Sequence, residues 1–190
     1  AVNVAGDEPM QVEVTATSGD HVVEVPRTAA MSAEHVVPLV GMRAERTYTI
    51  DVETFDDAGE SVMATAAAEF TTSALPPWFE EHEVTVDPDR AAPGYTIVEF
   101  DPALPEDEGP FTQYLVAYDT AGEVVWYYTN SGTLGGVEQT GDGAFLMHYW
   151  PFGIREVDVA GRVVAQWRPQ PTNAWGDTLD DEALIDGVDP

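Results

Sequence analysis

The sequence contains no cysteine and no lysine. The absence of cysteine excludes disulfides, a thiol nucleophile, thiolate metal ligands and a lipid-anchored cysteine within this chain. The 7 basic residues are all arginine and are scattered, so they cannot form the basic stripe of a nucleic-acid-binding protein, and an anionic membrane surface is also disfavoured. No apolar run approaches the ~20 residues of a transmembrane helix, so we expect neither nucleic acid nor membrane insertion.

Acidic residues are in large excess. The chain of 190 residues has 35 Asp and Glu and a formal net charge of −28, while its 44% hydrophobic residues suffice for a folded core. The acidity is typical either of a salt-adapted or secreted protein, or of the compositional bias of GC-rich coding. We favour bias combined with an extracytoplasmic location, which is periplasmic, secreted or at the cell surface.

Neither end of the chain has the features of a natural terminus. The sequence begins with Ala1 rather than with Met, and it stops in the polar, acidic stretch Asp186–Pro190. No charged and apolar leader is present. We therefore expect a processed protein or a piece of a longer chain.

Residues 1–75 have strand patterns. Gln11–Thr17 and His21–Val25 both alternate and are separated by Ser-Gly-Asp, which predicts a hairpin. Thr47–Glu53 alternates strongly, and Glu69–Thr72 closes the section. Regular short strands with turn signals predict an antiparallel β-sandwich, and no helix is expected in the Ala-rich stretch before residue 69.

This section resembles a fibronectin type III domain. The matching pieces are Leu39–Met42, Thr47–Ile50, Asp57–Gly59 and Phe70–Thr72. The resemblance implies that Tyr48 is a corner tyrosine, whose hydroxyl bonds to upstream backbone. It also implies that part of the first strand is missing.

A proline-rich linker separates two predicted domains. Consecutive prolines in Leu75–Phe79 stiffen the chain and favour extended backbone. We place the sandwich at 1–75, a linker and lead-in strand at 76–94, and a second domain at 95–190.

The second domain contains an internal repeat. Tyr118–Trp126 aligns with Val157–Ala165, and each copy reads strand, Asp-x-Ala-Gly turn, strand. Asp158 follows Asp119 by 39 residues, with another hairpin pattern between the copies. A period near 40 holding about four strands is typical of a propeller blade. About two blades fit in this chain, so we expect it to be the front of a longer protein.

The order of sandwich, Leu-Pro-Pro linker and blades resembles bacterial aryl-sulfate sulfotransferases. The matching pieces are Pro93–Ile97, Tyr114–Asp119 through Val125–Tyr128, Gly141–Leu146, and Ile154–Asp158 through Gln166–Trp167. The resemblance implies a six-bladed propeller, no cofactor, and transfer of a sulfuryl group from an aryl sulfate donor to a phenolic acceptor through a sulfated histidine. The chain has no His-His pair and no histidine after His148. We therefore expect the nucleophile beyond Pro190 and no activity from these 190 residues alone.

Two residues are candidates for the channel of such a propeller. His148 follows a strand pattern at its end, although a surface or packing histidine is the favoured interpretation. Arg155 is a candidate for holding an anion, although a strand charge balanced by Glu156 or by acidic loops is favoured. The remaining histidines are interpreted as structural or solvated; they are His21, His35 and His82.

Other chemistry has weaker signals. The acidic clusters Glu106–Glu108 and Asp177–Glu182 lack calcium-loop spacing, and no metal site is expected. No nucleophile-elbow pattern indicates a Ser-His-Asp triad. The alternative function is a non-catalytic extracellular binding or adhesion protein, with a quinoprotein-type propeller enzyme as a weaker third hypothesis.

Overall fold

The computed structural model confirms the predicted all-β class. It describes residues 1–79, 84–87, 89–90, 92–100, 112–131, 133–150, 153–168 and 185–186. Within these ranges the helical structure is the single 3-10 turn η1 (Pro77–Phe79), and no helix is long and apolar enough to cross a membrane. The chain forms two compact units, one of residues 1–95 with 118–126 and one of residues 96–117 with 127–190.

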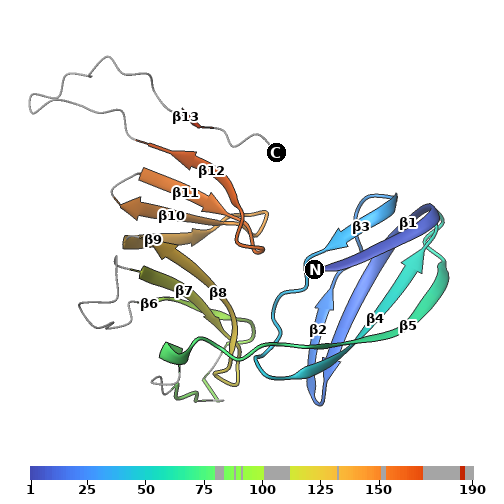
Figure 1. The fold of residues 1–190 in the computed structure, drawn as a ribbon, viewed down its shortest axis with the longest axis horizontal. Coiled ribbons are helices and arrows are strands. Elements are labelled where there is room, and N and C mark those ends of the chain that lie inside the picture. Colours follow the sequence, from blue (N-terminus) through green and yellow to red (C-terminus); the bar gives the residue numbers. More distant parts are fainter. Residues whose placement is uncertain are drawn as a thin grey trace, which may run out of the picture. The chain divides into compact units, whose positions relative to one another are not determined.

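The first unit holds a five-stranded antiparallel sheet. Its strands are β1 (Val2–Ser18), β2 (His21–Val25), β3 (Ser32–Val37), β4 (Thr47–Phe55) and β5 (Ser61–Thr71). The order is β2-β1-β4-β5, with β3 paired to β1 (Figure 1). The predicted hairpin is confirmed, since Ser18 pairs with His21 across the β1–β2 turn. The Ala-rich stretch lies in β5, so the expectation that it forms no helix is confirmed.

Strand β1 is longer than the sequence pattern indicated because it takes part in three ladders. Its first residues pair with β3, and its later ones pair with β2 and β4. The register of the β1–β3 ladder shifts between Ala5 and Met10, so the bulge marks the change of partners. His35 lies at this irregularity, where its Nε2 is 2.8 Å from the Met10 carbonyl oxygen.

The core of the first unit follows from strand alternation. Val12, Val14 and Ala16 occupy every second position of β1 and are buried, because successive side chains point to opposite faces. The same cluster includes Val23 on β2, Val37 on β3, Tyr48 and Ile50 on β4, and Leu39 in the loop after β3.

Two more sheets follow. The first has the order β6-β7-β8, made of β6 (Thr96–Phe100), β7 (Thr112–Tyr118) and β8 (Val124–Ser131). The second has the order β13-β12-β11-β10-β9, made of β9 (Thr133–Gln139), β10 (Phe145–Trp150), β11 (Gly153–Val157), β12 (Val163–Trp167) and β13 (Ile185–Asp186) (Figure 1).

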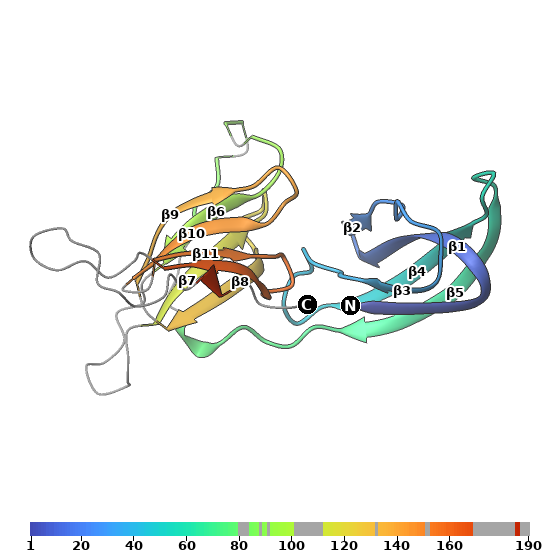
Figure 2. The ribbon, with the colours of Figure 1, turned by 90° about the horizontal axis from the view of Figure 1, so that it is seen from above.

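The predicted period of four strands is confirmed. From Asp119 to Asp158 the chain runs through β8, β9, β10 and β11. The boundary between the sheets falls inside this period, because β8 closes one sheet and β9 opens the next. Strand β6 lies beside β9, where the Val137 N–H donates to Glu99 Oε1 at 3.3 Å (Figure 2).

Candidate functional site

Three turns with the same sequence pattern share one geometry. In the turns that begin at Asp56, Asp119 and Asp158, the Oδ1 atom accepts the N–H groups two and four residues later, at 2.9–3.0 Å. The glycine of each turn has a positive φ of 79°, 80° and 79°, respectively, which disfavours any side chain there. Since the Asp56 turn lies outside the repeat, this turn alone does not identify a repeat unit.

The second carboxylate oxygen distinguishes the two repeat turns. Asp119 Oδ2 accepts from Arg43 Nε at 2.7 Å, whereas Asp158 Oδ2 accepts from Arg162 Nε at 2.8 Å. Burial alone would raise the pKa of Asp119, but the Arg43 hydrogen bond, two backbone N–H donors and the Arg43 charge lower it below its ordinary value. Burial likewise would raise the pKa of Asp158, but the hydrogen bonds and the charge of Arg162 outweigh it and leave this pKa lowered.

The guanidinium of Arg155 connects strands of two sheets. Its Nη1 donates to Tyr128 Oη at 3.3 Å and to Asn130 Oδ1 at 3.2 Å, both on β8. Its Nε and Nη2 donate to Gln166 Oε1 on β12 at 3.3 and 3.1 Å. Its Cζ lies 3.7 Å from the centroid of the Tyr149 ring on β10. The sequence did not reveal these partners.

Arg155 and His148 point to opposite faces of their sheet. The ladder places Met147, Arg155 and Gln166 opposite one another, so they share one face. His148 pairs with Ile154 in the neighbouring row, which lies on the other face, and its side chain is exposed. The structure therefore does not bring these two sequence candidates together around one group.

All the acceptors of Arg155 are neutral. Among the described residues no carboxylate forms an ion pair with it, and the ion pairs found there involve Arg43 and Arg162 instead. Glu156 follows Arg155 on the strand and so points to the opposite face. This half-buried guanidinium lies among hydroxyl, amide and aromatic groups, an arrangement that suits an anion or a polar link between sheets.

The other histidines occupy structural positions or fall outside the description. His21 Nε2 lies 2.9 Å from the Gly41 carbonyl oxygen, and its ring meets the edge of Tyr48. His35 is buried and bonds to backbone carbonyls. His82 and both acidic clusters lie outside the described residues. In the part that the structure describes, no group of three or more His, Asp or Glu side chains is placed to hold a metal ion.

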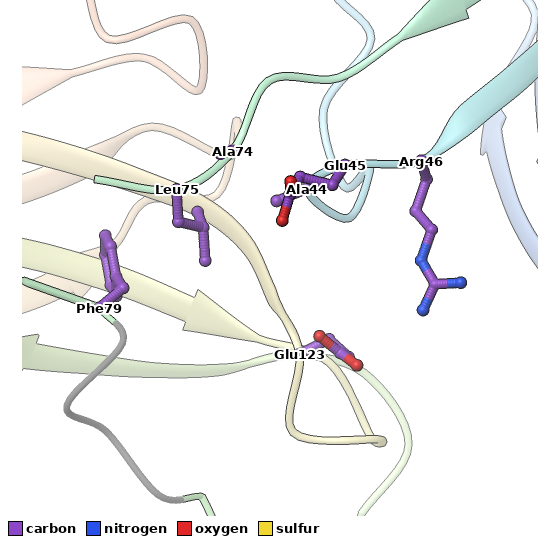
Figure 3. Close-up of a pocket in the computed structure, with 7 residues that line it drawn as sticks. All are labelled: Ala44, Glu45, Arg46, Ala74, Leu75, Phe79 and Glu123. Atoms are coloured by element: carbon purple, nitrogen blue, oxygen red, sulfur yellow. The ribbon is translucent and has the colours of Figure 1, made fainter. Parts of the chain in front are cut away.

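A cleft of about 430 Å³ lies in the first unit. Figure 3 shows Leu75 and Phe79 on one side and Arg46 on another, with Glu123 below them. The full lining is Ala44, Glu45, Arg46, Ala74, Leu75, Phe79 and Glu123. Two carboxylates face one guanidinium and no histidine contributes, so the cleft lacks both a nucleophile and an excess of positive charge for an anionic substrate.

Comparison with known proteins connects the chain with one family. A model of the arylsulfotransferase (ASST) family matches residues 60–174. No curated protein matches the sequence. A crystal structure of a protein of unknown function from Bacteroides caccae shares 13% identity and covers 88% of this chain, with a TM-score of 0.28. The chain spans 64% of the length of that protein.

The matched range contains β6 to β12, the repeat with its two Asp-x-Ala-Gly turns, and Arg155 with all its partners. It covers well over half of the 190 residues. The chain therefore belongs to the arylsulfotransferase family.

Proposed function

We propose that the protein transfers a sulfuryl group from an aryl sulfate to a phenol, with a histidine as the transient carrier. The match of residues 60–174 to the arylsulfotransferase family is the observation that supports this. A neutral imidazole nitrogen attacks sulfur, the S–O bond to the aryl group breaks, and the aryl oxygen leaves with the electron pair and is then protonated. The phenol oxygen next attacks sulfur, loses its proton, and the S–N bond breaks.

The carrier histidine is, in our proposal, supplied by sequence outside these 190 residues. His21 and His35 are occupied by backbone carbonyls in the first unit. His148 lies on the sheet face opposite Arg155, so these two cannot hold one sulfuryl group together. Arg155 remains the candidate for influencing an anion, since its charge has no carboxylate partner among the described residues.

We also propose that the two later sheets are successive blades of a propeller, which follow a fibronectin III-like domain along the chain. Shifted by 39 residues, Leu115 and Tyr128 correspond to Ile154 and Trp167. Leu115 is fully buried and the Tyr128 hydroxyl accepts from Arg155 of the following sheet, whereas Ile154 and Trp167 are 43% and 39% exposed. The face that is covered in the first sheet is open in the second, which favours a further sheet over it. An extracytoplasmic location remains part of the proposal.

The test uses protein expressed from the whole reading frame that contains this sequence. With 4-nitrophenyl sulfate as donor, we expect release of 4-nitrophenolate to depend on added phenol, and a histidine peptide to carry one SO₃ group in mass spectra taken without acceptor. A matched control omits the donor. Binding of phenols without sulfuryl transfer and without a modified histidine would contradict the proposal and favour the non-catalytic binding protein.

Variants separate the roles of the two residues named above. His148→Gln should retain transfer, because the proposed carrier lies elsewhere. Arg155→Gln should lower kcat/KM about tenfold or more if its charge acts on the anion. A sulfated His148 would overturn the placement of the carrier, while an Arg155→Gln protein with unchanged kcat/KM would limit that residue to a structural role.

A further inference from the structure

The backbone around Arg43 is fixed from several sides. Its N–H donates to the Tyr48 hydroxyl at 2.8 Å, and its carbonyl accepts from Thr72 Oγ1 at 2.7 Å. The Arg46 N–H donates to the same Thr72 Oγ1 at 3.0 Å. Tyr48 is completely buried. The segment that carries the Arg43 side chain is therefore held by Tyr48 on β4 and by Thr72, the residue that follows β5.

From this fixed segment Arg43 reaches a residue 76 positions later. Its Nε lies 2.7 Å from Asp119 Oδ2, and the two side chains are 19% and 9% exposed. The equivalent oxygen of Asp158 is occupied by Arg162 from its own turn, and that arginine side chain is 80% exposed. Two turns of the same geometry thus have different arginine partners. Arg43 is distant in sequence and its pair with Asp119 is shielded from water, whereas Arg162 belongs to the same turn as Asp158 and is solvated.

A second contact involves the same turn. A Cβ added to Gly122 would lie 3.0 Å from Val84 Cγ1 and 3.0 Å from Val86 Cγ2. At the equivalent Gly161 a Cβ would meet, among the described residues, Tyr128 at 3.9 Å. Val84 and Val86, two of the described residues between η1 and β6, therefore pack closely on Gly122 of this turn.

We propose that Arg43 and Asp119 form a latch that holds the turn of the first repeat to the backbone segment that Tyr48 and Thr72 fix. Residues 118–126 and residues 1–95 belong to one compact unit, as this latch requires. Arg43 lies upstream of the range matched by the family model, and Asp119 lies within it. The latch fixes the turn at which the first repeat begins, whereas the turn at which the second repeat begins binds an arginine of its own.

Hydrogen exchange followed by mass spectrometry tests the latch, using the full protein with Arg43→Gln. We expect amides of residues 118–126 to exchange about tenfold faster or more, because a hydrogen-bonded, shielded charge pair is lost. Arg162→Gln is the matched control, since it removes the solvated pair of the equivalent turn, and residues 158–162 should change less than about threefold. Peptides of β10 and β11 should keep their protection in both variants.

A milder variant keeps the test informative where Arg43→Gln does not fold. Arg43→Lys retains the charge but loses the Nε donor, so exchange at 118–126 should rise by an intermediate factor. Asp119→Asn should in turn accelerate exchange in residues 41–48. Equal responses of the Arg43 and Arg162 variants, or protection at 118–126 that stays at the wild-type level, would overturn the latch.

Discussion

At the scale of single residues, a sequence resemblance predicts that the Tyr48 hydroxyl bonds to upstream backbone, and the structure identifies the partner as Arg43. Its hydroxyl accepts the N–H of Arg43, five residues upstream, and the side chain has no exposed surface. A corner tyrosine therefore does more than fill the core, because it fixes the backbone of the residue that binds Asp119.

Tyr48→Phe should lower the free energy of unfolding by about 1–2 kcal/mol, because a half-buried N–H loses its acceptor. Urea denaturation at neutral pH measures the change. Tyr95→Phe is the control, since Tyr95 is 59% exposed, and it should stay within about 0.5 kcal/mol of wild type. Equal effects of the two substitutions would refute the role of the hydroxyl.

The equivalent glycines of the two repeat turns allow a matched comparison. Gly122→Ala and Gly161→Ala share the cost of placing a side chain at positive φ, about 1–2 kcal/mol. Only Gly122→Ala also forces a Cβ against Val84 and Val86. Its midpoint in urea should therefore fall further, by the equivalent of about 1–3 kcal/mol. A larger loss for Gly161→Ala would contradict the packing described for this turn.

At the scale of elements, Arg155 joins β8, β10 and β12. The buried Asn130 and the Tyr128 hydroxyl both accept from its Nη1, and the planar guanidinium lies on the Tyr149 ring. Lysine cannot reproduce both the fork of donors and the stacking.

Arg155→Lys should therefore destabilise the protein by about 1–3 kcal/mol despite conserving charge. Thermal and urea unfolding measure the loss. Arg162→Lys, at the solvated pair, serves as the control and should be nearly neutral. If Arg155→Lys proves as mild as this control, the guanidinium contributes little to joining the sheets.

Local patterns explain what could be predicted from the sequence. The hairpin strands and the 39-residue repeat follow from alternation and from turn residues that are neighbours in the chain. Strand β3 escaped prediction because Ser32–Val37 does not alternate cleanly. Counting outward from the Asp158 turn pairs Arg155 with Ala165, but a bulge between Glu156 and Val157 shifts the register and brings Gln166 opposite instead.

The latch was also beyond prediction. Nothing in the sequence connects Arg43 to Asp119, because their contact depends on tertiary structure rather than on spacing. Likewise, the placement of His148 and Arg155 on opposite faces requires the observed ladder, although they are only seven positions apart in the chain.

At the scale of the whole molecule, the ion pair between Asp119 and Arg43 makes stability depend on pH. The pKa of Asp119 is lowered in the folded protein despite its burial, chiefly by Arg43. A lowered carboxyl pKa contributes stability above the ordinary value of 3.8, and this contribution is lost as pH falls through the lower folded value.

Asp119→Asn should therefore destabilise the protein most at about pH 5–7, where the wild-type carboxylate is charged. The loss should become progressively smaller below about pH 4. Urea unfolding of wild type and variant across this range gives the difference. A difference that grows on acidification would show that the charge of Asp119 does not stabilise the fold.

Salt should raise the melting temperature. With a net charge of −28, repulsion between carboxylates opposes the compact state. Dissolved ions screen this repulsion between charges farther apart than the Debye length, which is about 10 Å at 0.1 M salt. Calorimetry between low salt and about 0.5 M NaCl tests this expectation, with sucrose as a control that adds no ions. A melting temperature that falls with salt would mean that attractive pairs dominate.

The position of the sheet boundary inside the 39-residue period has a consequence for how such a protein could change its length. Residues 119–157 contain β8, which completes one sheet, and β9 to β11, which begin the next. Because this segment starts at one Asp-x-Ala-Gly turn and ends just before the equivalent one, a tandem duplication of it would insert a whole sheet while each hairpin keeps its partner. The unit that can be duplicated without breaking a hairpin therefore begins and ends at the Asp-x-Ala-Gly turns, and not at the edges of the sheets.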